Sequence, residues 1–196
     1  MNLMTNIRRS AAQRMTASHN KRRKGATAVE FALSVPIWAA LLLGSSDGAF
    51  MMLQSQRVDR VAFSVTDIVT QSETLTIADL DNTMLAASQL MEPFTFGSKG
   101  IVIVTSLYKP SGLAVKISWQ YSGGGSLARA SKIGTFGQTP TMPNGLTLND
   151  NENVIVSEVY YAFTPMFINA SILAAKDFYR VAVYKPRLSP LITPPT

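Results

Sequence analysis

The chain has 196 residues, no cysteine, a single histidine and a formal net charge of +6. Without cysteine it has no disulfide, no thiolate metal site and no cysteine nucleophile, and the lone His19 excludes a multi-histidine metal site or a histidine-based triad. This length suits one membrane segment and one modest domain. We therefore expect no common hydrolase, no cofactor, no metal and no small-molecule substrate.

The basic residues gather in an arm formed by residues 1–25. Seven lysines and arginines precede Glu30 with no acid among them, so the chain from Glu30 onward carries a net charge of −1. The arm has no aromatic residue to stack on bases and no recognisable nucleic-acid-binding fold, so nucleic acid is not an expected partner. Beside an apolar segment, such an arm is typical of a topogenic signal. Its basic cluster consists of Lys21, Arg22, Arg23 and Lys24.

An apolar segment follows, in which residues 28–53 contain only two charges, Glu30 and Asp47. A helix of these 26 residues would be about 39 Å long, against roughly 30 Å for the hydrocarbon core of a bilayer. We expect it to cross the membrane with the arm in the cytoplasm. Pro36 should bend this helix, and Asp47 should either face protein, water or a partner or lie beyond the membrane.

A cleavable secretory signal is the structural alternative, because a basic region followed by a short apolar run fits it too. The possible cleavage site near Ser45 runs on into Asp47 and further apolar residues, which favours a continuing helix. Twin-arginine export through Arg8 and Arg9 is not favoured, because the apolar run begins some twenty residues later.

Helical periodicity continues beyond the membrane segment. Apolar residues recur at spacings of three and four from Val58 to Ile68, which predicts an amphipathic helix to about Thr70. A second helix is predicted from Ile77 to Leu90, with Thr76 as a possible N-cap.

After Gly97 the periodicity changes to alternation. Residues 101–108 and 113–121 predict an antiparallel hairpin joined by a Pro-Ser-Gly turn, with every second residue from Leu113 to Tyr121 facing inward. Further strands are predicted at residues 154–163 and 177–185. The fold class is therefore α+β, with two helices and an antiparallel sheet of about four strands.

The remaining segments are expected to be loops. Residues 122–153 are rich in glycine, proline, serine and asparagine, which predicts a long surface excursion. Within it, GSLARASKIG and NDNEN lack the geometry of a catalytic or calcium site and are expected to be solvated. The proline-rich tail at residues 188–196 should be extended.

The amino-terminal segment carries a recognisable motif. A glycine, four residues, Glu30 and Phe31 before an apolar helix resemble the processing site of type IV prepilins and pseudopilins. The longer stretch RRKGATAVEFALSVPIWAALLLGSSDGAF resembles the start of the TadE/TadG-like family of the tight-adherence (Flp) pilus system. Segments RVDRVAFSVTDIVTQ, YYAFTPMF and FYRVAVYKPR are similar to longer members. The matching positions are Gly25, Ala28, Glu30, Phe31, Pro36, Gly44 and Asp47.

The resemblance implies a minor pseudopilin or pilus-assembly component rather than an enzyme. Prepilin peptidase would cut between Gly25 and Ala26, and Glu30, Phe31, Pro36 and Asp47 would serve assembly or helix packing. The implied partners are the membrane, pilins and the pilus secretion machinery. The implied location is the bacterial inner membrane with a periplasmic C-terminal domain, and the pilus or cell surface after processing. The corresponding segments are a leader at 1–25, a membrane helix at 26–53, an α+β domain at 54–187 and the tail.

Two alternative functions stay open. The chain could be an unprocessed assembly factor retained in the membrane. It could also be a surface adhesion module, with the glycine-rich loop and exposed aromatic residues as its binding face. The aromatic candidates are Trp119, Tyr121, Tyr160 and Tyr161, although alternation favours a core position for most of them.

Overall fold

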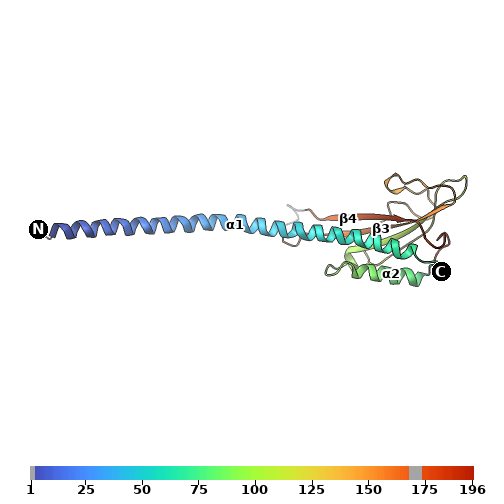
Figure 1. The fold of residues 1–196 in the computed structure, drawn as a ribbon, viewed down its shortest axis with the longest axis horizontal. Coiled ribbons are helices and arrows are strands. Elements are labelled where there is room, and N and C mark those ends of the chain that lie inside the picture. The colour runs from blue at the N-terminus through green and yellow to red at the C-terminus, as the bar shows by residue number, and fades with distance from the viewer. Residues whose placement is uncertain (1–2, 168–173) are drawn as a thin grey trace. The chain divides into compact units, whose positions relative to one another are not determined.

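The structure is a computed structural model that describes residues 3–167 and 174–196, with side chains from residue 26 onward. It divides into two compact units, Met1–Asp47 and Gly48–Thr196. Figure 1 shows the elements, and the predicted α+β fold is confirmed. They are α1 (Leu3–Thr70), α2 (Ile77–Gln89), η1 (Gly97–Lys99), β1 (Gly100–Lys109), β2 (Lys116–Gly123), η2 (Pro143–Gly145), β3 (Glu152–Phe163) and β4 (Lys176–Tyr184).

Helix α1 begins well before the predicted membrane segment. Residues 3–24 contain neither glycine nor proline and are rich in alanine, arginine, lysine and methionine, all of which favour helix. Helix α2 begins as predicted, because the Thr76 side chain accepts from the Asp79 amide while the Asp79 carboxylate accepts from the Thr76 amide. The Asp79 carboxylate also accepts from the Thr76 hydroxyl at 2.6 Å, and this bond, followed by the one from the Thr76 amide, lowers the pKa of Asp79.

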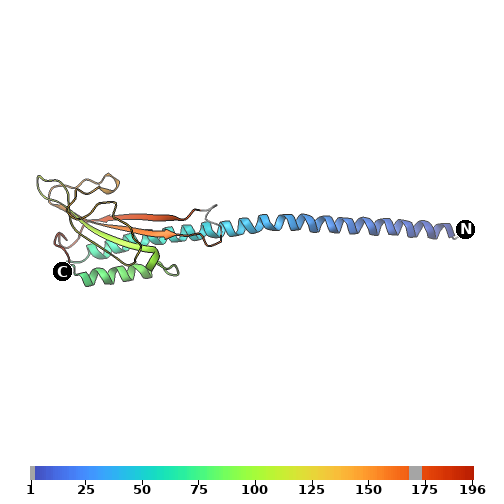
Figure 2. The same cartoon turned by 180° about the vertical axis from the view of Figure 1, so that it is seen from behind.

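The sheet of unit 2 has the strand order β2-β1-β3-β4, and every neighbouring pair is antiparallel. The predicted hairpin is confirmed, with Val104 opposite Tyr121. On its other side, β1 pairs with β3 through Val102 and Val159. Figure 2 shows the same sheet from behind.

One face of the sheet packs against the two helices. In unit 2 the buried residues of α1 recur at helical spacing and belong to the same core cluster as residues of β1, β3 and β4. Helix α2 adds three buried apolar residues to this cluster. The helical contribution consists of Val58, Val61, Ala62, Val65, Val69, Leu80, Met84 and Ala87. This face contains the main hydrophobic core.

The opposite face is covered by the connection between β2 and β3. Ile133 and Leu148 are 1% and 6% exposed and pack against Leu107, Val154 and Val156 of the sheet. The prediction that this connection is a solvated surface excursion is therefore wrong at these positions. Its few apolar residues are widely spaced, and together they form a second core that no local periodicity indicates.

The predicted alternation in β2 is wrong at one point, because the strand contains a β-bulge. Ser106 pairs with Trp119 and Leu107 with Ile117, which leaves Ser118 as the extra residue. Trp119 consequently joins the helix-facing core, whereas Ile117 joins the second core. The strand also begins at Lys116, and Leu113 is exposed.

The proline-rich tail is in an irregular conformation and packs back on the domain. Leu191 is buried, its amide donates to Asn153 Oδ1 at 3.1 Å, and its carbonyl accepts from Trp119 Nε1 at 2.9 Å. The Arg187 amide donates to Thr70 O at 3.0 Å. The tail thus connects the end of α1 with the sheet.

Candidate membrane anchor and assembly site

The apolar part of unit 1 is a helix whose large side chains are all exposed, with fractions between 40 and 70%. Exposure of so much apolar surface to water is costly, at about 25 cal/mol per Å². In the described chain, one helical segment, Ala26–Thr70, is long and apolar enough to cross a membrane. These exposed residues are Val29, Phe31, Leu33, Val35, Ile37, Trp38, Leu41, Leu42 and Leu43.

The hydroxyl groups in this helix are satisfied by the helix itself. Ser34 Oγ donates to Phe31 O at 2.9 Å, and both Ser45 Oγ and Ser46 Oγ donate to Leu42 O, at 2.9 and 2.8 Å. Polar side chains that bond to their own backbone can lie in lipid at little cost. The helix is therefore suited to an apolar environment.

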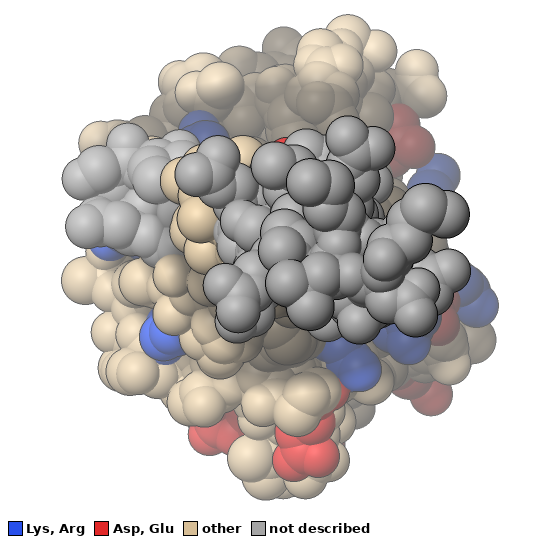
Figure 3. Space-filling view, turned by 90° about the vertical axis from the view of Figure 1, so that its left-hand side faces the viewer, with Lys and Arg blue, Asp and Glu red and all other residues tan. Residues whose placement is uncertain are grey.

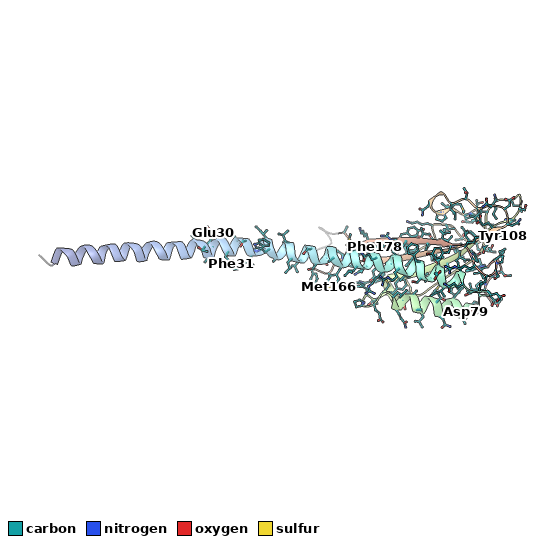
Figure 4. All side chains as sticks on the ribbon, in the orientation of Figure 1. Glu30, Phe31, Asp79, Tyr108, Met166 and Phe178 are labelled. Atoms are coloured by element: carbon teal, nitrogen blue, oxygen red, sulfur yellow. The ribbon has the colours of Figure 1, made fainter. Side chains whose placement is uncertain are left out.

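The predicted site residues lie on this one helix. Glu30 and Phe31 are both exposed and project from it (Figure 4). Pro36 lies inside α1, where it lacks the amide that would bond to the carbonyl four residues earlier. Asp47 is only 1% exposed. These four residues lie along one helix, so the distances between them are set by their spacing in the sequence.

The proposed cleavage point and the basic cluster lie in the helical backbone of α1. Ala26 is exposed. The side chains of residues 21–24 lie outside the described part, so their predicted topogenic role stays a prediction. Farther along, Phe31, Val35, Trp38 and Leu42 follow spacings of four, three and four, and together line one shallow groove on the helix. Such spacing is typical of a helix-packing stripe.

Comparison with family models identifies this segment. Residues 25–66 match the family described as TadE-like protein. The TadE-like match begins at Gly25 and includes Glu30, Phe31, Pro36 and Asp47, so the suspected family resemblance is confirmed there. No curated protein and no solved structure matches the chain. The TadE-like segment and the apolar helix together fit a membrane protein associated with the tight-adherence pilus.

Unit 2 contains a buried carboxylate that sequence reasoning missed. Glu158 of β3 is fully buried, and both of its oxygens accept hydrogen bonds from the connection between β2 and β3. Ser131 Oγ donates to Oε2, while the Lys132 amide and the Tyr179 hydroxyl each donate to Oε1 at 2.9 Å. The Lys132 ammonium lies 3.8 Å from the centre of the Tyr179 ring.

Two tyrosines beside this carboxylate have raised pKa values. Burial, followed by the Glu158 charge, raises the pKa of Tyr160 to about 12. The pKa of Tyr179 is also raised, first by burial and then by Glu158. Tyr160 donates to Ala130 O at 3.0 Å. The cluster therefore attaches the loop to the sheet, and a lone acid within the apolar run VIVSEVYYAF was the signal for it.

The aromatic residues considered for adhesion lie mainly in the cores. Trp119, Tyr160 and Tyr161 are at most 4% exposed. Tyr121 is partly exposed, and its hydroxyl donates to Asp81 Oδ1 at 2.6 Å. Trp119, Tyr160 and Tyr161 therefore contribute to the packing of the fold, and the adhesive role stays a prediction. Among the described residues, no three His, Asp or Glu side chains lie close enough to hold a metal ion.

Proposed function

We propose that the chain is a processed minor pseudopilin of the tight-adherence pilus. The observation that carries this proposal is the exposed apolar helix that directly follows Gly25 and Glu30 within the TadE-like match. The helix anchors the chain in the inner membrane, with the arm cytoplasmic and unit 2 periplasmic. Its exposed stripe packs with pilin or secretion-machine helices. The role is structural rather than enzymatic.

Processing by prepilin peptidase is part of the proposal. The peptide bond between Gly25 and Ala26 lies within α1, so a peptidase must unwind the helix locally. Glycine favours this unwinding, because in a helix it is less stable than alanine by about 1 kcal/mol. Cleavage would remove the basic arm and create an ammonium group at Ala26.

Glu30 is the proposed partner of this ammonium. It lies four residues along the helix from Ala26, which places the two on the same face. Near neutral pH an amino-terminal amine is mostly protonated and can pair with an acidic side chain. Their attraction is strong where little water is present, and pairing between neighbouring subunits would favour one axial register.

Replacement of Glu30 by glutamine is expected to lower the amount of this chain in purified pili about tenfold, which corresponds to about 1.4 kcal/mol. Glutamine keeps the size and one acceptor oxygen, but it replaces the other oxygen by an NH2 donor and removes the charge that pairs with the ammonium. Quantitative immunoblotting of pili against total membranes measures this incorporation.

Ser34→Ala is the matched control, because the Ser34 hydroxyl bonds only to its own helix and its loss should leave incorporation unchanged. Both variants should accumulate normally in the membrane. If Glu30→Gln enters pili as well as Ser34→Ala does, the proposed pairing is wrong.

A further inference from the structure

The first helical turn of unit 2 is apolar on every side. Residues 50–53 read Phe-Met-Met-Leu, and Met52 and Leu53 are 63% and 48% exposed. One side of this turn adjoins the main core through Met51. The remaining sides require an apolar environment of their own, because such a turn is not amphipathic.

A second apolar segment lies beside this turn. Met166 and Phe167, just beyond β3, are 72% and 48% exposed. The Phe167 ring lies 6.3 Å from the ring of Phe50, which in turn lies 6.3 Å from Phe94. Aromatic contacts at these distances are favourable and hold the two segments together.

These residues mark one end of unit 2. In Figure 4, Met166 lies at the opposite end of this unit from Asp79 and Tyr108. Leu113 and Phe136 are exposed singly on separate loops, which is ordinary for a protein surface, and the exposed Phe63 of α1 lies 6.4 Å from the ring of Tyr184. We call the group at this end the apolar collar, which consists of Phe50, Met52, Leu53, Met166 and Phe167.

The collar begins close to the membrane helix along the chain. Phe50 is three residues beyond Asp47, the last residue of unit 1. A helix from Ala26 to Leu53 is about 42 Å long, which equals the thickness of a bilayer with its headgroups, about 40–45 Å. A membrane-spanning α1 therefore places the collar at the level of the outer headgroups.

The charges around the collar also suit a lipid surface. Residues 48–56 carry no charge, and residues 57–60, Arg-Val-Asp-Arg, have a net charge of +1. Lys176 is exposed and lines a surface groove with Met51 and Met52, and Asp177 and Arg180 line the same groove. No described carboxylate pairs with Lys176. In Figure 3 the visible described surface is mainly uncharged, with separate groups of Lys, Arg, Asp and Glu distributed over it. Apolar residues bordered by lysine and arginine are typical of membrane interfaces.

We propose that the apolar collar inserts into the headgroup and upper acyl region of the outer leaflet, with Lys176 beside lipid phosphates. The domain is then held by a second membrane contact in addition to its helix. This inference rests on the membrane anchorage given under Proposed function. Lipid is the occupant because the collar is continuous in sequence with the membrane helix and adjoins Lys176, which lies 5.6 Å from the Phe178 ring centre and has no carboxylate partner among the described residues.

The full chain contains no cysteine, so single cysteines can carry a fluorescent probe that responds to polarity. We would label Met166→Cys, with Leu113→Cys as the matched control because its side chain is 64% exposed. The labelled chains are reconstituted in vesicles of phosphatidylethanolamine and phosphatidylglycerol that contain nitroxide-labelled lipids. Leu41→Cys, in unit 1, reports on anchorage separately.

At position 166 we expect blue-shifted emission and quenching by headgroup nitroxides several-fold greater than at position 113. Quenching at position 166 that does not exceed the control would overturn the proposal, and blue-shifted emission without quenching would indicate a second copy or a protein partner instead. Quenching by acyl-chain nitroxides at position 41 confirms anchorage independently. If the probe at position 41 is not quenched, both the proposed membrane anchorage and the proposed insertion of the collar are wrong.

Discussion

Replacement of Glu158 by alanine is expected to lower the free energy of unfolding by about 3 kcal/mol, because it removes a fully buried carboxylate and leaves three partly buried donors without an acceptor. These donors are the Ser131 hydroxyl, the Lys132 amide and the Tyr179 hydroxyl. Two of them belong to the loop, so its attachment to the sheet should weaken first. Chemical unfolding of the full chain in detergent micelles, followed by near-ultraviolet circular dichroism, measures the loss.

A conservative variant of Glu158 distinguishes the loss of its charge from the loss of its hydrogen-bond acceptors. Glu158→Gln keeps an oxygen for the Lys132 amide and the Tyr179 hydroxyl and should cost about 1 kcal/mol. Glu73→Ala, at an exposed acid, is the matched control and should change stability by less than about 0.5 kcal/mol. If Glu158→Ala is as stable as Glu73→Ala, the carboxylate does not hold the loop.

Gly125→Ala is expected to destabilise the domain by about 3 kcal/mol through steric overlap. A β-carbon at Gly125 would overlap the carbonyl oxygen of Gly100 and lie 2.6 Å from that of Gly97. Both neighbours are backbone atoms and cannot rotate away. The affected segment is anchored there, since the amides of Ser126 and Leu127 donate to these same two carbonyls at 2.8 and 3.1 Å.

Gly97→Ala serves as the control for this substitution. Its β-carbon would meet only a Thr95 methyl group at 4.0 Å, so stability should change little. Thermal unfolding of the two variants in micelles compares them directly. Equal melting temperatures for Gly125→Ala and Gly97→Ala would show that the loop does not pack closely on η1 and β1.

The helices were predictable because their signals are local. The spacing from Val58 to Ile68 and the capping residue Thr76 each depend on neighbours within one or two helical turns. The predicted hairpin likewise follows from an apolar segment at residues 101–108, an alternating segment at 113–121 and the Pro-Ser-Gly turn between them. The membrane anchor is the strongest of these signals, since it needs only length and apolar composition.

The missed features depend on contacts between distant parts of the chain. Ile133 is buried because the sheet offers an apolar face, not because its own segment is apolar. Glu158 accepts hydrogen bonds from residues more than 25 positions away. Because of the bulge at Ser118, Ile117 and Trp119 lie on opposite faces of the sheet. The bulge can be recognised only from the pairing of β2 with β1.

The candidate site was only partly predictable. The motif around Glu30 identified the TadE-like segment, because it lies within a short continuous stretch. The apolar collar was not anticipated, since it joins the first turn of unit 2 to residues more than 100 positions later through the contact between Phe50 and Phe167. Position in the chain alone did not distinguish Met166 from an ordinary loop residue.

The mass of the mature amino terminus tests the proposed function most directly. The chain would be purified from membranes and pili of its own host, with and without prepilin peptidase, and its amino-terminal peptide identified by mass spectrometry. We predict a mature chain that begins at Ala26 and is lost when the peptidase is absent. An intact arm would contradict processing and indicate a retained assembly factor, and cleavage near Ser46 would contradict both the pseudopilin and the membrane anchor.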